Sequence, residues 1–332
     1  DLRHALVTGG GGFLGRYVVE QLLERGDRVT SFARGSYPEL AALGVRLIQG
    51  DLADAAAIEG ACAGVDVVFH VASKTGYWGP WDAFYRANVT GTENVIAACR
   101  AQHVPKLVYT STPSVVFDNR PHRGCDESLP YPETYQNNYS HTKAMAERAV
   151  LDANGSNGLV TTALRPHLIV GPGDRHLVPR IIARAGTGKV PQVGDGSNKV
   201  DLTYAGDAAR AHLLAAEALA PGSPVAGSVY FISQDEPVNA WQWIDELLVA
   251  LDLPPVRKKV PLWLALAASS VLELAYETLP LEGEPRLTRF LANELALSHY
   301  YDISRAKRDF GYRPSLNIQE VTEKVIADLQ AR

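Results

Sequence analysis

The chain has 332 residues, a length that suits one large α/β domain or a domain with a smaller lobe. Hydrophobic residues make up 46% and charged residues 21%, so disordered, collagen-like and coiled-coil chains are excluded. The formal net charge of −5 gives no global positive field, and a nucleic acid is therefore not expected as a partner.

Short apolar runs alternate with helical stretches through the first half of the chain. Residues 5–8 are apolar and too few for a helix, whereas residues 16–25 carry apolar side chains at helical spacing. Further strands are predicted at 28–32, 45–49, 65–70, 106–111 and 160–164, and a helix at 93–102. Continuous apolar strands separated by helices are typical of a parallel sheet covered on both faces. The predicted fold class is α/β, with a Rossmann-type doubly wound parallel sheet.

Proline and glycine become frequent in the second half, where this regular alternation ends. Helices are predicted at 207–219 and 241–251, and a strand at 228–232. We therefore expect one domain over residues 1–170 and a smaller C-terminal lobe over 171–332, from which a segment near 200–233 returns to the first domain.

The first strand runs directly into a glycine-rich loop, and a helix follows at once. Glycine is needed in such a loop for a tight turn, for close approach to a pyrophosphate and for packing of the helix on the strand. The diphosphate would lie at the helix N-terminus, where free N–H groups and the dipole favour anions. The residues expected to hold the dinucleotide are Gly9, Gly12, Phe13, Leu14 and Gly15. Residues 1–170 are therefore expected to form a dinucleotide-binding domain, and residues 171–332 a mainly substrate-binding lobe.

The end of the second strand separates NAD binding from NADP binding. A carboxylate for the ribose 2′-hydroxyl is expected about 20 residues past the glycine motif, but residues 31–36 contain none. Arg34 stands there instead, where its guanidinium could pair with a 2′-phosphate. The alternative is a solvated surface arginine. NADP(H) is therefore the preferred cofactor, with NAD(H) as the alternative.

Residues after other strands also belong to the expected cofactor site. Asp51, which precedes Leu52, could accept a hydrogen bond from the adenine amino group, or it could cap the helix that follows. Ala72 is small enough for the nicotinamide ribose to lie close to it. Asn88 could be structural, or it could hold a water that relays protons to Lys143.

Tyr139 and Lys143 are four residues apart on a predicted helix, so both side chains lie on one face. A phenol titrates near pH 10. A neighbouring ammonium lowers that pKa, so Tyr139 could act as an acid or a base near neutrality. Ser111 and Thr112 follow the fifth strand, where a hydroxyl could hold the substrate carbonyl oxygen or merely form a turn.

Taken together, these motifs resemble the extended short-chain dehydrogenase/reductase superfamily over essentially the whole chain. The matching motifs are Gly9 to Gly15, the Tyr139/Lys143 pair, Asn88-Val89-x-Gly91-Thr92 and Leu164-Arg165-Pro166. The resemblance implies that Thr112 is the catalytic hydroxyl, with Ser111 as the neighbouring candidate. It also implies that Lys143 contacts the nicotinamide ribose and that the backbone from Pro166 to Leu168 contacts the carboxamide.

Later motifs resemble the 3β-hydroxysteroid dehydrogenase branch of that superfamily; they lie at residues 109–115, 177–180, 194–204, 299–304 and 311–314. Within the branch, the sequence is similar to bacterial 2-alkyl-3-oxoalkanoate reductases and to sterol-4α-carboxylate 3-dehydrogenases. Both groups act on a 3-keto or 3-hydroxy carbon next to a carbon that bears a carboxylate. The resemblance implies an oxidoreductase for a bulky apolar substrate, either a β-keto acid or a 3β-hydroxysteroid, and Arg34 makes NADP(H) its expected cofactor.

A carboxylate substrate needs a cation in the second lobe. The candidates are Arg175, His176, Arg180 and Lys199, each of which could instead be a plain surface charge. Tyr204 is a further candidate substrate residue. Trp78 belongs to an aromatic cluster after the fourth strand that either lines the pocket or packs the loop.

Two rival functions are a nucleotide-sugar epimerase or dehydratase on the same fold and a non-catalytic NADP-binding scaffold or sensor. Arg34 and the apolar second lobe argue against the first. The intact set of Tyr139, Lys143 and Thr112 argues against the second.

Residues 260–272 carry no charge, yet the run is shorter than the roughly 20 residues that a membrane-spanning helix needs. It is expected to be a buried helix, or else a lid or interface helix that contacts a membrane or a partner enzyme through 260–276. A homodimer is also expected. The three widely spaced cysteines make neither a disulfide framework nor a metal site, so a cytoplasmic protein is predicted, peripheral attachment to a membrane being the alternative.

Overall fold

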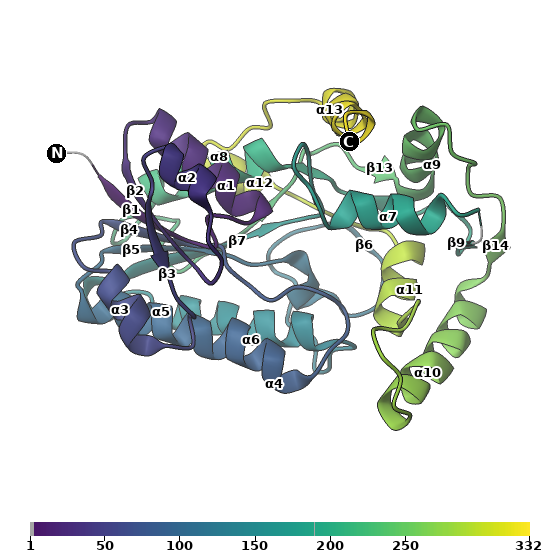
Figure 1. Ribbon diagram of the computed structural model, residues 1–332, viewed down its shortest axis with the longest axis horizontal. Helices are drawn as coiled ribbons and strands as arrows, with labels where there is room; N and C mark the ends of the chain where they lie inside the picture. Colours follow the sequence, from purple (N-terminus) through teal and green to yellow (C-terminus); the bar gives the residue numbers. More distant parts are fainter. Residues whose placement is uncertain (1–2, 189) are drawn as a thin grey trace.

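The computed structural model describes residues 3–188 and 190–332 and is built around a seven-stranded sheet (Figure 1). All neighbouring strands are parallel, in the order β12-β7-β5-β4-β1-β2-β3. Their bounds are β1 (His4–Thr8), β2 (Arg28–Ala33), β3 (Arg46–Gln49), β4 (Val67–His70), β5 (Lys106–Thr110), β7 (Val160–Pro166) and β12 (Val229–Ile232). The strand order reverses at β1, which makes this the switch point where doubly wound sheets bind ligands. The predicted Rossmann-type fold is confirmed.

Helices cover both faces of this sheet, as its apolar strands require (Figure 1). One face packs against α1 (Phe13–Glu24), α8 (Ala205–Ala218) and α12 (Ser304–Phe310); the other packs against α3 (Ala55–Ala61), α5 (Gly91–Ala101) and α6 (Asn138–Asp152). Short elements connect them: α2 (Pro38–Ala42), α4 (Trp81–Phe84), the π-helix η1 (Tyr85–Thr90) and the 3₁₀ turns η2 (Pro113–Val116) and η3 (Ser156–Gly158). Strand β1 and strand β4 are buried at every position, which fixes the centre of the core.

The second half of the chain adds small sheets and helices beside the carboxyl ends of the main strands. A four-stranded sheet joins β13 (Val238–Asn239), β10 (Lys199–Val200), β15 (His299–Tyr301) and β6 (His122–Cys125); two pairs join β8 (Ile169–Val170) to β11 (Thr203–Tyr204) and β9 (Gln192–Val193) to β14 (Lys259–Val260). The remaining helices are α7 (Leu177–Ala185), α9 (Ala240–Ala250), α10 (Leu262–Thr278), α11 (Arg289–Ala296) and α13 (Ile318–Gln330). The predicted strand at 228–232 is present as β12, at one edge of the main sheet.

Residues 262–272 of the apolar run form the first part of α10, at the edge of the molecule beside α11 (Figure 1). Only Ala265, Ser269 and Glu273 of this helix are buried, whereas Trp263 is 70% and Val271 69% exposed. The prediction of a buried helix is therefore wrong. Across the described residues, no helix has both the length and the apolar character needed to cross a membrane. Contact of this helix with a membrane or a partner enzyme stays a prediction, as does the homodimer.

Candidate active site

The glycine loop between β1 and α1 has the shape of a dinucleotide cradle. Gly9 has a φ of +72°, and a Cβ atom added to Gly15 would lie 2.0 Å from the Gly9 carbonyl oxygen. A larger residue therefore fits neither position. Gly12 is the N-cap of α1 and supplies no side-chain cap, so the first-turn N–H groups, including those of Phe13 and Leu14, can bind an anion. These residues fit a dinucleotide cofactor.

The end of β4 closes the other side of this loop. The Cα atom of Ala72 lies 2.9 Å from the position of a Cβ added to Gly9. The Ala72 N–H donates to Thr8 Oγ1 at 3.2 Å, and the Thr8 hydroxyl contacts His70 Nδ1 at 2.7 Å. The other ring nitrogen of His70 contacts Thr92 Oγ1 at 2.8 Å. This buried network fixes the segment directly after β4, including the small residue Ala72, beside the glycine loop.

Asp51 lies after β3 and does not cap a helix. Its carboxylate accepts a hydrogen bond from Ala53 N at 2.9 Å and pairs with Arg86 at 3.2 Å, while Asp54 caps α3. The alternative in which Asp51 is the N-cap is therefore wrong. The Ala53 hydrogen bond lowers the pKa of Asp51, and the charges of Arg86 and Arg34 lower it further. A contact of Asp51 with adenine stays a prediction.

Asn88 sits on the single π-helical turn η1, a type of turn that is frequent at functional sites. Its Oδ1 accepts a hydrogen bond from Lys74 N at 2.7 Å, and its Nδ2 donates to Lys74 O at 3.0 Å and to Thr142 Oγ1 at 3.1 Å. The structural role is thus confirmed: Asn88 ties the loop after β4 to α6. The Leu52 carbonyl oxygen accepts a hydrogen bond from Asn94 Nδ2 of α5 at 2.8 Å. The water-holding role of Asn88 stays a prediction.

Helix α6 places Tyr139 in its first turn, two residues after the capping residue Asn137. Burial raises the pKa of Tyr139 to about 12, and a hydrogen bond with the Thr112 hydroxyl opposes that shift. Ser111 is turned elsewhere, toward the Glu147 carboxylate, whose pKa it helps to lower. Of the two predicted hydroxyls, Thr112 is therefore the one that faces Tyr139.

Lys143 is buried on the same face of α6. Its Nζ donates to the Thr110 carbonyl oxygen at 2.6 Å and lies 4.2 Å from the centre of the Tyr109 ring. Burial lowers the pKa of Lys143 to about 7, and the charge of Glu147 opposes this. The expected lowering of the Tyr139 pKa by this ammonium is not found, because burial of the phenol dominates.

An ion pair that was not predicted from the sequence lies behind these side chains. Glu147 is completely buried and binds Arg165 through two hydrogen bonds, with N–O distances of 2.9 Å and 2.6 Å. The signal was present in the spacing, since Tyr139, Lys143 and Glu147 recur every four residues on α6. Arg165 precedes Pro166 at the end of β7, so the pair joins α6 to the segment that is expected to contact the carboxamide.

The aromatic cluster after β4 reaches the second lobe. Trp78 packs edge-on against Tyr276 of α10 with ring centres 6.1 Å apart, and Tyr77 packs on Phe290 of α11 at 5.1 Å. Burial raises the pKa of Tyr77, and the charges of Glu294 and Tyr139 raise it further. The cluster therefore both packs the loop and brings α11 toward the reacting residues. Glu294 was missed because a lone carboxylate on an ordinary helix has no sequence signature.

The predicted substrate cations differ in their surroundings. Arg180 pairs with Glu284, which also binds Arg184 at 3.0 Å. The charge of Arg180 lowers the pKa of Tyr77, so Arg180 lies on the side of the active site. The other predicted substrate residues are exposed or packed elsewhere: Arg175, His176 and Lys199 are exposed, and Tyr204 packs against Tyr17 of α1 with ring centres 6.1 Å apart.

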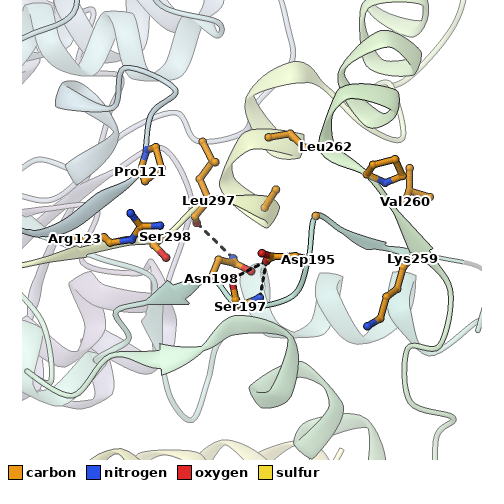
Figure 2. A pocket seen from close by; sticks show the side chains of 13 residues that line it. Pro121, Arg123, Asp195, Ser197, Asn198, Lys259, Val260, Leu262, Leu297 and Ser298 are labelled. Atoms are coloured by element: carbon orange, nitrogen blue, oxygen red, sulfur yellow. Dashed lines mark hydrogen bonds between the residues drawn. The ribbon is translucent and has the colours of Figure 1, made fainter.

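A surface pocket of about 520 Å³ lies in the second lobe and is separate from this site (Figure 2). Its lining comes from β6, the 194–198 loop, the start of α10 and the end of α11, and neither Tyr139 nor Lys143 is part of it. Figure 2 shows Arg123 and Lys259 at its two sides. The pocket therefore has no part in proton transfer by Tyr139.

The fold, the glycine loop at its switch point and the Tyr139–Lys143–Thr112 set define an NAD(P)-dependent oxidoreductase of the extended short-chain dehydrogenase/reductase superfamily. Within it, the chain belongs to the 3-beta hydroxysteroid dehydrogenase/isomerase family, which it matches over residues 6–262. The family resemblance expected from the sequence is confirmed.

Relatives of known name cover nearly the whole chain. It is 50% identical to a 2-alkyl-3-oxoalkanoate reductase of Stenotrophomonas maltophilia, covering 98% of this chain and 99% of the relative. It is 49% identical to the enzyme of the same name in Shewanella oneidensis, covering 98% and 86%. It is 37% identical to a decarboxylating sterol-4-alpha-carboxylate 3-dehydrogenase of Mus musculus, covering 96% and 89%.

Solved structures agree with the fold. The structure of gox2253 superposes with a TM-score of 0.80 at 27% identity, covering 98% of each chain. MoeE5 in complex with UDP-glucose and NAD gives a TM-score of 0.76 at 25% identity, covering 99% of each chain. The neighbours support an NAD(P) cofactor for this fold.

Proposed function

We propose that the protein is an NADP(H)-dependent oxidoreductase that interconverts a 3-keto and a 3-hydroxy group on a β-keto acid of the 2-alkyl-3-oxoalkanoate type. The observation that carries this proposal is the identity of about half of all residues, over nearly the full chain, with two reductases of that name. A 3β-hydroxysteroid or sterol is the second candidate substrate, because a sterol dehydrogenase is also similar over 96% of the chain.

The chemistry follows from three side chains. When bound, the nicotinamide supplies or takes up the hydride at the carbinol carbon. In reduction, the Tyr139 phenol donates its proton to the substrate oxygen, and the Thr112 hydroxyl orients that oxygen by a hydrogen bond. With a pKa of about 12, Tyr139 holds its proton at neutral pH, which suits the reductive direction. Lys143, buried on the same face of α6, is proposed to contact the nicotinamide ribose.

The second lobe supports a bulky apolar substrate with one anionic end. Tyr77 is close enough to Tyr139 for the two phenols to influence each other, and it packs on Phe290, while the adjacent Trp78 packs on Tyr276. Arg180 is the proposed partner of the carboxylate: it shares the single carboxylate of Glu284 with Arg184, which leaves an excess of positive charge.

The preference for NADP(H) rests on Arg34. Its side chain is exposed beyond β2, and within the described residues its guanidinium makes no ion pair that a 2′-phosphate would have to displace. A hydrogen bond to a charged group contributes about 1.5–3 kcal/mol. NADPH should therefore bind about ten- to a hundredfold more tightly than NADH.

The substrate proposal is tested by following NADPH oxidation with a 2-alkyl-3-oxoalkanoate and with a 3-keto steroid, and by following product formation from a UDP-sugar in the presence of NAD. We expect turnover of the β-keto acid with a kcat/KM at least tenfold above that of the steroid. Turnover of the UDP-sugar alone would favour the epimerase or dehydratase, and binding of cofactor without any turnover would favour the scaffold.

The cofactor proposal is tested by steady-state kinetics with each coenzyme at fixed ionic strength, because salt screens such pairs. Arg34→Ala should remove most of the preference for NADPH and leave NADH almost unaffected. Arg46→Ala, an exposed arginine at the start of β3, serves as the control. Equal use of both coenzymes by the wild-type protein would refute the assignment.

A further inference from the structure

Tyr37 bridges the two segments that flank the adenosine end of the cofactor site. It follows β2 and is the residue before α2. A Cβ atom added to Gly11 would lie 2.4 Å from three carbons of the Tyr37 ring, and one added to Gly35 would lie 3.0 Å from its hydroxyl oxygen. The ring therefore extends from the glycine loop to the residue directly after Arg34.

This position matters because of how such folds hold a dinucleotide. The pyrophosphate lies at the N-terminus of the first helix, and the 2′-position of the adenosine ribose lies at the end of the second strand. A side chain that contacts both the glycine loop and the β2 end must therefore border the 2′-position. Tyr37 is half-buried and packs against the main core, so its ring is held in place.

The Tyr37 hydroxyl is free to bind a ligand. In the part of the chain that the structure describes, it makes no hydrogen bond, and the exposed Arg34, three residues earlier in the chain, makes no ion pair. The Tyr37 hydroxyl lies against Gly35, the residue after Arg34, so the segment after β2 carries two donors, one of them charged, and such a pair matches a phosphate better than a hydroxyl. A ribose 2′-hydroxyl would instead call for an acceptor, and residues 31–36 contain no carboxylate.

We propose that Tyr37 is a specificity-determining residue of the cofactor site, whose hydroxyl donates a hydrogen bond to the 2′-phosphate of NADP(H) alongside Arg34. The inference rests on the proposed NADP(H) preference. Gly11 is part of the same binding site, because only a residue without a side chain leaves room for the Tyr37 ring. Space, not backbone conformation, requires glycine at position 11, since its φ is not positive.

The test measures binding of two adenosine nucleotides that lack the nicotinamide, so that the readout does not depend on turnover. Calorimetry with 2′,5′-ADP and with 5′-AMP is carried out on the wild type, Tyr37→Phe and Arg34→Ala. Tyr37→Phe should weaken the binding of 2′,5′-ADP by about tenfold, which is the scale of one hydrogen bond to a charged group. The affinity for 5′-AMP should stay unchanged. Tyr300→Phe, a half-exposed tyrosine in the second lobe, is the matched control.

The outcomes separate the two proposals. Equal affinity of the wild type for both nucleotides would overturn the NADP(H) preference and this inference with it. A preference for 2′,5′-ADP that is lost in Arg34→Ala but retained in Tyr37→Phe would overturn the role of Tyr37 alone. An equal loss of affinity for both nucleotides in Tyr37→Phe would also overturn the role of Tyr37, because the hydroxyl would then not recognise the 2′-phosphate.

A double-mutant cycle tests the link between Gly11 and Tyr37. Gly11→Ala should weaken 2′,5′-ADP in the wild-type background, because the added methyl group displaces the ring. The same change in Tyr37→Ala should cost little more, since the ring is no longer there. Equal losses in both backgrounds would show that the ligand itself, not Tyr37, needs glycine at position 11, and would overturn that part of the inference. Thermal melting checks that each variant is folded.

Discussion

Tyr139 and Lys143 are neighbours on one face of α6, and burial moves their pKa values in opposite directions. The pKa of the Tyr139 phenol rises to about 12 and the pKa of the Lys143 ammonium falls to about 7, because burial disfavours the charged form of each group. The sequence predicts the pair and its spacing, but the sign of the Tyr139 shift depends on how deeply the phenol is enclosed. A protonated Tyr139 at neutral pH is the state that ketone reduction requires.

Removal of the Tyr139 hydroxyl tests the proton-donor role. Tyr139→Phe should lower kcat by about 10²–10⁴-fold, the scale of a positioned acid or base. Cofactor affinity, measured by quenching of protein fluorescence, should change little, because the ring that packs beside the site is retained. Wild-type turnover in this variant would refute the assignment of Tyr139.

The pH dependence of reduction tests Lys143. With a pKa of about 7 in the free protein, Lys143 loses its proton as the pH rises through neutrality. We expect kcat/KM, which reports free-enzyme pKa values, to fall about tenfold per pH unit above that point. In Lys143→Arg this fall of kcat/KM at high pH should disappear, since arginine stays charged. If kcat/KM of Lys143→Arg falls in the same way above neutral pH, the titrating group is not Lys143.

At the scale of elements, α6 and β7 are joined by a buried ion pair. Glu147 on α6 and Arg165 on β7 bind each other through two hydrogen bonds, and Tyr131 donates a third to Glu147. The charge of Glu147 also helps to keep Lys143 protonated. The pair thus connects the helix that carries the proton donor to the strand whose end is expected to meet the nicotinamide.

Breaking this pair should be costly because it leaves a buried charge without a partner. Glu147→Gln should lower the free energy of unfolding by about 3–5 kcal/mol, measured by urea denaturation. Glu133→Gln, an exposed glutamate in the preceding loop, is the control and should change stability little. Similar stability of the two variants would mean that the pair is not energetically important.

At the scale of the whole molecule, several buried histidines hold the fold together in their neutral form. His70 links β4 to Thr8 and Thr92, and His212 of α8 bonds to the Ala208 carbonyl and to Thr110 Oγ1 at 2.7 Å each. Burial lowers the pKa of His70 to about 3 and that of His212 to about 4. The unfolded chain, with histidine near 6.5, binds protons in a pH range where the folded protein does not.

Stability should therefore depend on pH with a defined sign. The contribution of these histidines is fully present above pH 6.5 and is lost as the pH falls from there toward 4, by up to about 1.4 kcal/mol per pH unit for each histidine. His212→Gln should be less stable than the wild type at pH 8, and the difference should narrow as the pH is lowered. A constant difference between pH 8 and pH 4.5 in urea denaturation would contradict this account.

The sequence by itself determined the main sheet and the cofactor loop. Buried strands such as β1 and β4 are stable only between two layers of helices. Glycine is needed at positions 9 and 15 because a side chain there would collide with the neighbouring backbone. The face shared by Tyr139 and Lys143 follows from helical geometry alone. These features are local, so periodicity and spacing are enough to predict them.

Tertiary structure decided what depends on contacts between distant segments. The choice of Thr112 over Ser111, the burial of Glu147 against Arg165 and the approach of Glu294 to Tyr77 join residues far apart in the chain. The exposure of α10 was equally undetermined, because an apolar run has the same sequence whether a neighbour covers it or not. Burial and charge proximity set these properties, and both arise only when the chain is folded.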